Sequence, residues 1–149
     1  MFVCYGNICR SPMAEFIMKD LVKSMGEEHD FVISSSATHT DGLGCRPHRG
    51  TRQILDRIGI SYEGKVGVML SRSDYDKYDY FVAMDKDNVY DMKRMLGGDK
   101  EGKIKLLLEF AGESRDVADP YWTGDFEATY RDVKKGTKAL YDFIKAKKR

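Results

Sequence analysis

A cysteine and an arginine near the start of the chain enclose five residues, and a Ser-Pro pair follows directly. The segment is Cys4-Tyr5-Gly6-Asn7-Ile8-Cys9-Arg10-Ser11-Pro12. Pro suits the first turn of a helix because its missing N–H would be unpaired there, and a Ser before it can cap a free N–H group. We therefore expect a strand over Met1–Val3, a tight loop over Cys4–Arg10 and a helix from Pro12. Backbone N–H groups and a helix N-terminus then point at one spot, which suits an anion.

A thiol lies at the base of this expected anion site and a guanidinium at its rim. Only the thiolate is nucleophilic, and the helix N-terminus, the loop N–H groups and Arg10 all favour the anion. The same groups can hold three phosphoryl oxygens, and Arg10 is a planar two-pronged donor that Lys cannot imitate. Gly6 and Asn7 tolerate the left-handed backbone geometry that such a loop needs. The segment predicts phosphoryl chemistry at Cys4; a Gly-Asn turn with Cys4 as a buried apolar residue is the alternative.

Alternating strands and helices are expected to position this loop. Apolar spacing and Gly or Pro breaks predict, in chain order, a helix over residues 12–25, a strand over 31–33, a loop over 34–47, a helix around 54–58, a strand over 80–84, a helix over 86–96 capped by Asp85, a strand over 104–108 and a helix over 130–144. This order predicts an α/β fold, with a four-stranded, mostly parallel sheet and helices on both faces in three layers. Ligands of such folds bind beyond the carboxyl ends of the strands, where the Cys4 loop is expected.

Length and composition limit the classes of protein to which the chain can belong. With 149 residues, of which 42% are hydrophobic and 33% charged, the chain is expected to form one globular domain over residues 1–149. The formal net charge of +1 argues against nucleic acid as a partner, which usually requires a concentrated basic face. No apolar stretch approaches membrane-spanning length and no signal-peptide pattern precedes Cys4. We therefore expect no membrane association and a cytoplasmic location.

The cysteines and histidines do not form a recognisable structural site. Three cysteines, Cys4, Cys9 and Cys45, are an odd number in a chain without an export signal, which disfavours a disulfide framework. The Cys-x4-Cys spacing lacks a downstream Cys or His pair at ligand distance, so no metal site is expected. Surface positions are expected for the three histidines, His29, His39 and His48.

The loop continues into a longer string, Cys-Tyr-Gly-Asn-Ile-Cys-Arg-Ser-Pro-Met-Ala-Glu, over residues 4–15. This string resembles the active-site loop of the low-molecular-weight protein tyrosine phosphatases. The resemblance covers essentially the whole chain. Residues 36–60 match Ser-Ala-Thr…Gly-x-x-Pro…Leu-x-x-x-Gly-Ile, residues 79–88 match Asp-Tyr-x-x-x-Met-Asp-x-x-Asn, and Asp119-Pro120-Tyr121 matches the general-acid loop of the family.

The resemblance implies a role for each matching residue. Cys4 attacks phosphorus and becomes a thiophosphate, while Arg10 binds the phosphoryl group. Asp119 protonates the leaving phenolate and then activates water to hydrolyse the intermediate. The loop residues placed by the resemblance against the phosphate or the thiolate are Tyr5, Gly6, Asn7, Ile8, Cys9 and Ser11. No cofactor and no metal is implied.

Two further assignments concern the surroundings of the loop. Tyr121 and Trp122 are expected to line the mouth and to pack against a flat aromatic substrate; a place in the core is the alternative for both. Cys9 resembles the second loop cysteine of the family, which can form a reversible disulfide with the nucleophile and divert a sulfenic acid from irreversible oxidation. Packing at the start of the helix is the alternative for Cys9.

The chain departs from the family pattern in two places. Many members carry an aromatic residue on the variable loop beside the pocket, where this chain has Thr40-Asp41-Gly42. We therefore expect one wall of the pocket, at Asp41, to be open or acidic. The usual His-x-Ala-Arg segment is Lys65-Val66-Gly67-Val68 here, so a histidine contact to the active-site loop is expected to be missing.

The favoured activity is hydrolysis of phosphotyrosine in proteins or peptides, with inorganic phosphate or similar oxyanions as product or inhibitor. Bacterial protein-arginine phosphatases resemble the loop but carry Thr in place of Ile8, and related arsenate reductases need a further cysteine pair where this chain has only Cys45. A phosphate-binding or redox-sensing module without turnover is a third alternative, against which Asp119 argues. The chain is expected to be a monomer or to self-associate weakly.

Overall fold

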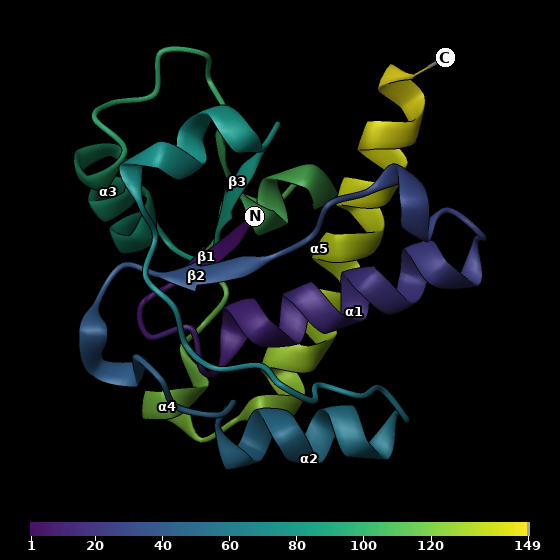
Figure 1. Ribbon diagram of the computed structural model, residues 1–149. Helices are drawn as coiled ribbons and strands as arrows, with labels where there is room; N and C mark the ends of the chain where they lie inside the picture. Colours follow the sequence, from purple (N-terminus) through teal and green to yellow (C-terminus); the bar gives the residue numbers. More distant parts are fainter. Residues whose placement is uncertain (149) are drawn as a thin grey trace.

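Four short parallel strands form the centre of the molecule in the computed structural model, which describes residues 1–148 (Figure 1). The strands and α-helices are, in chain order, β1 (Phe2–Cys4), α1 (Arg10–Ser24), β2 (Ser35–Ala37), α2 (Arg49–Arg57), β3 (Phe81–Ala83), α3 (Lys86–Met95), β4 (Ile104–Leu106), α4 (Pro120–Thr123) and α5 (Phe126–Lys147). The 3-10 helices are η1 (Glu28–Asp30), η2 (Thr40–Gly42), η3 (Arg72–Lys77) and η4 (Leu107–Ala111). The strand order is β2-β1-β3-β4 and every pairing is parallel, which confirms the predicted α/β sheet.

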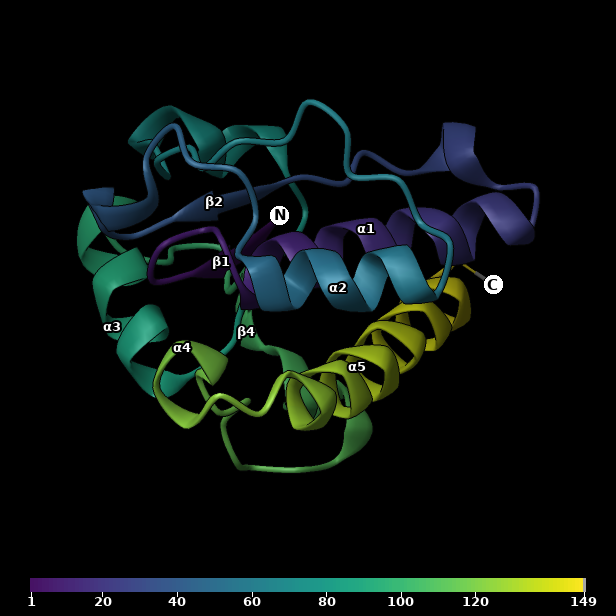
Figure 2. The same cartoon turned by 90° about the horizontal axis from the view of Figure 1, so that it is seen from below.

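The sheet separates two apolar clusters because successive residues of a strand point to opposite faces. One cluster joins Phe2, Cys4 and Val82 to residues of α1 and α5, and the other joins Val3 and Phe81 to residues of α3. Figure 2 shows α1, α2 and α5 together, with α3 apart from them. Helices therefore cover both faces, as the alternation along the chain predicts.

The Cys4 loop lies at the carboxyl edge of the sheet. Its strand, β1, is central: Cys4 aligns with Ala37 of β2, and Val3 aligns with Ala83 of β3. Residues that follow β2 and β3 therefore come to the same edge as the loop. This topology brings η2 and the start of α3 beside Cys4 although they are distant in sequence.

The second strand is not where the apolar run predicts it. Phe31–Ile33 precedes the strand, and β2 is the small polar segment Ser35–Ala37, all of it buried. Phe31 and Ile33 pack as half-buried residues against the core, while Val32 is exposed. The expectation of a loop over residues 34–47 is therefore wrong for β2, because polar partners inside the protein compensate for burying its serines.

The other differences concern the bounds of elements. Helix α1 begins at Arg10 rather than Pro12, and its N-cap residue is Cys9, so Ser11 is not the cap. The fourth strand ends at Leu106 and continues into η4. Asp85 is the predicted N-cap of α3, where it forms a capping box with Asn88. Among residues 1–148, none of the helices combines the length and the apolar character that a membrane crossing needs.

Candidate active site

The backbone of the Cys4 loop is held in an unusual conformation by Asn7. Asn7 is the only non-glycine residue with a positive φ among residues 1–148, at 56°. Its Nδ2 donates to Ser11 Oγ and to Ser35 Oγ, both at 2.8 Å, and its Oδ1 accepts from Val68 N at 3.1 Å. These three bonds use both N–H donors of the Asn7 side-chain amide and one lone pair of its oxygen. They therefore determine the orientation of that side chain.

Two glycines allow neighbouring segments to approach this loop closely. A Cβ at Gly42 would overlap the carbonyl oxygen of Gly6, and a Cβ at Gly67 would overlap that of Gly42. Both obstacles are backbone atoms, which cannot move aside as a flexible side chain can. The segments of η2 and of residues 65–68 therefore stack on the loop through glycine contacts.

The Cys4 thiol lies at the bottom of the loop and is 2% exposed. Its Sγ is 3.0 Å from Ser11 Oγ and accepts a longer bond, 3.4 Å, from Ser11 N. Because Asn7 Nδ2 already donates to Ser11 Oγ, the hydroxyl hydrogen of Ser11 is free to point at the sulfur. Ser11 thus approaches the sulfur with donors from both its backbone and its side chain.

A buried ion pair supports the underside of the loop. Glu15 is 5% exposed, and its Oε1 accepts from Ser35 Oγ at 2.5 Å. Lys65 Nζ lies 3.5 Å from Glu15 Oε1 and donates to the Ser35 carbonyl at 3.1 Å, while Lys19 Nζ is 2.6 Å from Oε2. Burial lowers the pKa of Lys65, and the nearby Glu15 carboxylate opposes that shift. A continuous path of polar contacts thus runs from Lys65 to Cys4.

This path of polar contacts shows what replaces the His-x-Ala-Arg segment of the family pattern at residues 65–68. The histidine of the family pattern is absent, as expected, but contact with the loop is not lost. Val68 N bonds the side chain of Asn7, and Lys65 supplies a cation beneath it. The backbone and a buried lysine therefore support the loop in this chain.

Arg10 is 2% exposed and lies between two carboxylates. Its Nη1 donates to Asp85 at 2.7 Å and to the Val117 carbonyl at 3.0 Å, and its Nη2 donates to Asp119 at 3.3 Å. Burial alone would lower the pKa of Arg10, but Cys4, Asp119 and Asp85 raise it overall. Nε is buried without a hydrogen-bond partner within residues 1–148. A permanent cation thus faces the loop with an unused donor.

Asp119 is placed at the edge of the cleft by α4. It is the N-cap residue of that helix, with Oδ1 accepting from Tyr121 N at 3.1 Å and Oδ2 facing Arg10. Its side chain is 24% exposed, so the carboxyl group is accessible from solvent. An accessible carboxyl group beside a thiol and a guanidinium is suited to proton transfer.

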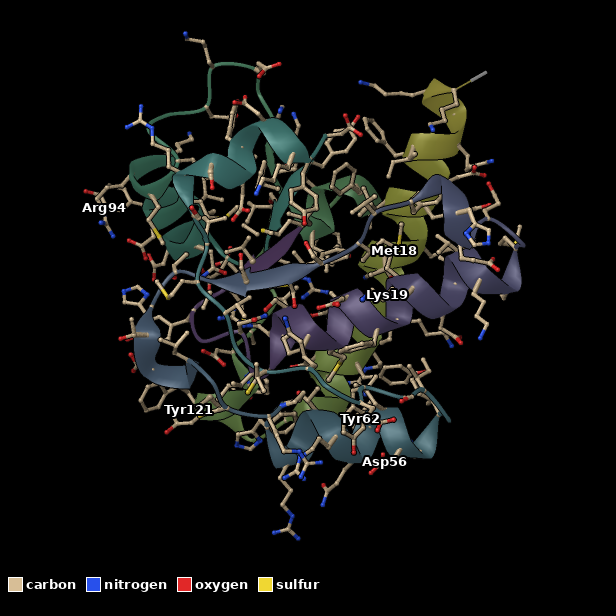
Figure 3. The ribbon with its side chains drawn as sticks, in the orientation of Figure 1. Met18, Lys19, Asp56, Tyr62, Arg94 and Tyr121 are labelled. Atoms are coloured by element: carbon tan, nitrogen blue, oxygen red, sulfur yellow. The ribbon has the colours of Figure 1, made fainter. Side chains whose placement is uncertain are left out.

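Aromatic side chains form the mouth of the cleft, which has a volume of about 760 Å³. Tyr5 stacks on His39 with ring centroids 4.0 Å apart, and its hydroxyl donates to Asp41 at 3.4 Å. Burial, with a contribution from Asp41, raises the pKa of Tyr5. Tyr121 and Trp122 are exposed on the other side, and Figure 3 shows Tyr121 pointing outward from α4. They are not in the core, and the wall at Asp41 is acidic as expected.

Most of the predicted site residues come together in this cleft. Those that line it are Cys4, Tyr5, Gly6, Ile8, Cys9, Arg10, Asp41, Asp119, Tyr121 and Trp122. Asn7 and Ser11 lie buried beneath it. Burial, together with Cys4, raises the pKa of Cys9 to about 12, so the Cys9 thiol stays neutral at physiological pH. A disulfide between Cys9 and Cys4 stays a prediction, since both are free here.

Sequence reasoning missed three kinds of contribution to the site. Asp85 was expected only as a helix cap, yet it is also the nearest carboxylate to Arg10. His39 and His48 are half-buried rather than fully on the surface: His39 stacks on Tyr5, and His48 packs edge-on against Tyr121. The support from Glu15 and Lys65 was also missed. The sequence did hold a signal for Asp85: it follows the predicted third strand closely, and residues that follow parallel strands meet at the same edge of the sheet as the Cys4 loop.

Comparisons with known proteins agree with this geometry. Residues 1–149 match the family described as low molecular weight phosphotyrosine protein phosphatase. The low molecular weight protein-tyrosine-phosphatase YfkJ of Bacillus subtilis is 41% identical over 99% of this chain and 96% of its own, and its crystal structure superposes with a TM-score of 0.95. The tyrosine phosphatase SP-PTP of Streptococcus pyogenes is 40% identical over 96% of this chain and 90% of its own, with a TM-score of 0.85.

An arginine phosphatase shares the fold as well. The structure of the drosophila arginine phosphatase DARP is 30% identical over 97% of this chain and 96% of its own, with a TM-score of 0.88. The fold therefore does not separate the two substrate classes. Family membership is nevertheless plain from the match over all 149 residues and from the relatives at about 40% identity: the chain belongs to the low molecular weight phosphotyrosine protein phosphatase family.

Proposed function

We propose that this chain, over residues 1–149, is a phosphatase domain that hydrolyses phosphotyrosine in proteins and peptides, and small aryl phosphates, through a cysteinyl-phosphate intermediate. One observation carries the proposal. The buried Arg10 lies in the same cleft as Cys4, is hydrogen-bonded to Asp119, and has an Nε without a partner among residues 1–148. A nucleophile, an anion-binding cation and an accessible carboxyl group are the parts that this reaction needs.

In the first step, Cys4 Sγ attacks phosphorus and forms an S–P bond while the bond from phosphorus to the phenolic oxygen breaks. Asp119 gives its proton to that leaving oxygen. Arg10 and the loop N–H groups hold the three equatorial oxygens, whose charge is stabilised best by donors already in position. Ser11 releases the sulfur as the S–P bond forms.

In the second step, Asp119, now a carboxylate, takes a proton from water. The oxygen of that water attacks phosphorus, the S–P bond breaks, and Cys4 leaves as the thiolate while inorganic phosphate is released. Ser11 then donates to the sulfur again. The hydrogen bonds from Ser11 therefore stabilise the negative charge that develops on Cys4 Sγ as it leaves phosphorus in this step.

Substrate comparison is the first test of this proposal. The intact enzyme is given phosphotyrosine, phosphoserine and phosphoarginine peptides of one sequence, and p-nitrophenyl phosphate, with and without a chelator. We expect phosphotyrosine and p-nitrophenyl phosphate to be hydrolysed fastest, without an effect of the chelator, because Arg10 and the loop supply the positive charge. Clearly faster hydrolysis of the phosphoarginine peptide would contradict phosphotyrosine as the substrate.

The nucleophile is tested by Cys4→Ser, with Cys45→Ser as the control because Cys45 is exposed and lies outside the cleft. We expect Cys4→Ser to lose activity by a factor on the order of 10⁶, as for other catalytic nucleophiles. Activity that survives Cys4→Ser would contradict the mechanism. Mass spectrometry of the rapidly quenched wild type should show one added phosphoryl group, which the Cys4→Ser variant lacks.

Further parts of the proposal concern partners. Tyrosine-phosphorylated proteins are the proposed substrates, and phosphate or similar oxyanions should compete with them because Arg10 and the loop bind any tetrahedral oxyanion. We also propose a monomer or a weakly self-associating protein, which sedimentation at several concentrations tests. A cytoplasmic location stays a prediction.

A further inference from the structure

Charges around the cleft are strongly one-sided. Five aspartates line it, against a single arginine. Arg10 is buried and is already shared by Asp85 and Asp119. The other three carboxylates that line the cleft are Asp41, Asp87 and Asp91, and within residues 1–148 the lining contains no Lys or Arg besides Arg10.

Two of these carboxylates and an aromatic ring lie on one face of α3. Asp87, Tyr90 and Asp91 are spaced i, i+3 and i+4, which places them side by side on a helix. Tyr90 is 73% exposed and makes no hydrogen bond or ring contact among the described residues. Asp41 of η2 lies across the mouth, and we call Asp41, Asp87, Tyr90 and Asp91 the acidic face.

The carboxylates of the acidic face have weak partners or none. Asp41 accepts one bond of 3.4 Å from Tyr5, and Asp87 has no cation at ion-pair distance within residues 1–148. Asp91 is 3.4 Å from Arg94, whose side chain is 62% exposed and points outward from α3 (Figure 3). The half-buried Asp132 carboxylate, by comparison, is held by a close bidentate pair with Arg115. The acidic face is therefore available to a cation from outside.

The floor of the cleft separately indicates where a ligand sits. Arg10 is only 2% exposed, and its Nε donates no hydrogen bond to any residue that the structure describes. An unpaired guanidinium N–H beside a thiol is satisfied when a phosphoryl group occupies the loop. A peptide whose phosphotyrosine reaches that floor must lay its neighbouring residues over the mouth, because consecutive residues are only about 3.5 Å apart along an extended chain.

We infer that the acidic face selects phosphotyrosine peptides that carry Lys or Arg within a few residues of the phosphotyrosine. This inference rests on the proposed function and names its substrate class. Carboxylates at the mouth repel the phosphate of an approaching substrate, and a cation beside the phosphotyrosine offsets that repulsion. The exposed ring of Tyr90 offers the same cation a π face between two carboxylates. Acidic flanking residues are disfavoured by the same charges.

The test compares two phosphotyrosine peptides that differ only in having Lys or Glu at the flanking positions. We expect kcat/KM to favour the Lys peptide by about tenfold or more at low ionic strength, because oppositely charged surfaces raise association rates. The ratio should fall towards one at about 0.5 M salt, where screening is strong. Equal rates for the two peptides at low salt would overturn the inference.

Variants locate the effect. Asp41→Asn with Asp87→Asn and Asp91→Asn should reduce the Lys/Glu ratio to near one. The matched control, Asp20→Asn with Glu28→Gln and Asp142→Asn, removes the same charge from exposed positions outside the cleft and should keep the ratio of the wild type. A preference that persists in the first variant, or disappears in the control, contradicts the assignment to the acidic face. The salt dependence of the wild type decides the matter if the first variant does not fold.

The two proposals fail in distinguishable ways. An enzyme that hydrolyses p-nitrophenyl phosphate but does not distinguish the peptides contradicts only the role of the acidic face. An enzyme that hydrolyses neither p-nitrophenyl phosphate nor any phosphotyrosine peptide contradicts the proposed function and the inference together.

Discussion

The underside and the mouth of the Cys4 loop are built in opposite ways. Beneath the loop, Asn7, Ser11 and Glu15 are at most 5% exposed and are joined by hydrogen bonds. At the mouth, Tyr121 and Trp122 are 58% and 81% exposed. A buried polar group left unpaired costs about 1–3 kcal/mol, whereas an exposed one is satisfied by water. The underside is therefore restricted to one arrangement, and the mouth can vary with the substrate.

Asp119 tests the contrast between a fixed underside and a variable mouth most severely, because it lies near the mouth and yet is the proposed general acid. We expect Asp119→Asn to lower kcat by a factor of about 10²–10⁴, the range for a lost general acid. The loss should be larger for phenyl phosphate than for p-nitrophenyl phosphate, since the better leaving group needs less proton transfer. Steady-state kinetics with both esters measures this difference, and equal losses would mean that Asp119 only positions Arg10.

Asn7 tests the underside. Asn7→Ala removes the partner of Ser11, Ser35 and Val68 N. It also leaves at a φ of 56° a residue that adopts the left-handed region less readily than Asn does. We expect a loss of about 2–4 kcal/mol in the free energy of unfolding, from unpaired buried groups and backbone strain, and a lower kcat. Denaturant unfolding measures the stability.

Asn7→Gly is the matched control, because glycine accepts a positive φ but has no amide. It separates the two causes of the loss. If Asn7→Gly is as stable as the wild type, backbone conformation matters and the hydrogen bonds beneath the loop do not, which would undo the contrast between the two regions.

Lys65 should make the support beneath the Cys4 loop, and with it kcat, dependent on pH. Because burial lowers the pKa of Lys65, its ammonium group loses its proton at a lower pH than that of an exposed lysine. Glu15 then loses one of its two cationic neighbours and keeps only the half-exposed Lys19. We expect kcat to decline on the alkaline side partly for this reason. Lys65→Arg, which stays charged, should extend the active range to higher pH, whereas Lys65→Met should have a low kcat throughout. Identical alkaline limbs for the wild type and Lys65→Arg would exclude this role.

Trp122 should give the smallest effect. Its side chain is 81% exposed, so Trp122→Ala should leave the free energy of unfolding within about 0.5 kcal/mol of the wild type. We expect a higher KM for a phosphotyrosine peptide, by a factor of less than about ten, and an unchanged kcat, because aromatic packing at the mouth adds only about 0.5–1.5 kcal/mol. A large fall in kcat would show that the mouth also takes part in the chemistry.

Local signals in the sequence predicted the fold well, and they named residues that meet in the cleft, whose catalytic roles stay predictions. Helical spacing, capping residues and short apolar runs placed three of the four strands and the α/β alternation. The failures occurred where distant partners override local preference. Ser35–Ala37 forms β2 because Asn7 and Glu15 bond Ser35, and Phe31–Ile33 was the more apolar choice. The local pattern favoured Ser11 as a helix cap, but its hydroxyl contacts Cys4 Sγ, seven residues away, where the family resemblance had placed it.

By itself, the sequence predicted the chemistry, because the residues from Cys4 to Pro12 are contiguous and their short-range geometry follows from residue type. Only the tertiary structure showed that Asp85 and Asp119 meet on Arg10, that Lys65 supports Glu15, and that Asp41 lies with α3 around one mouth. The physical reason is that ion pairs and pocket walls depend on distances in space. Parallel strand pairing sets those distances between residues that are far apart along the chain.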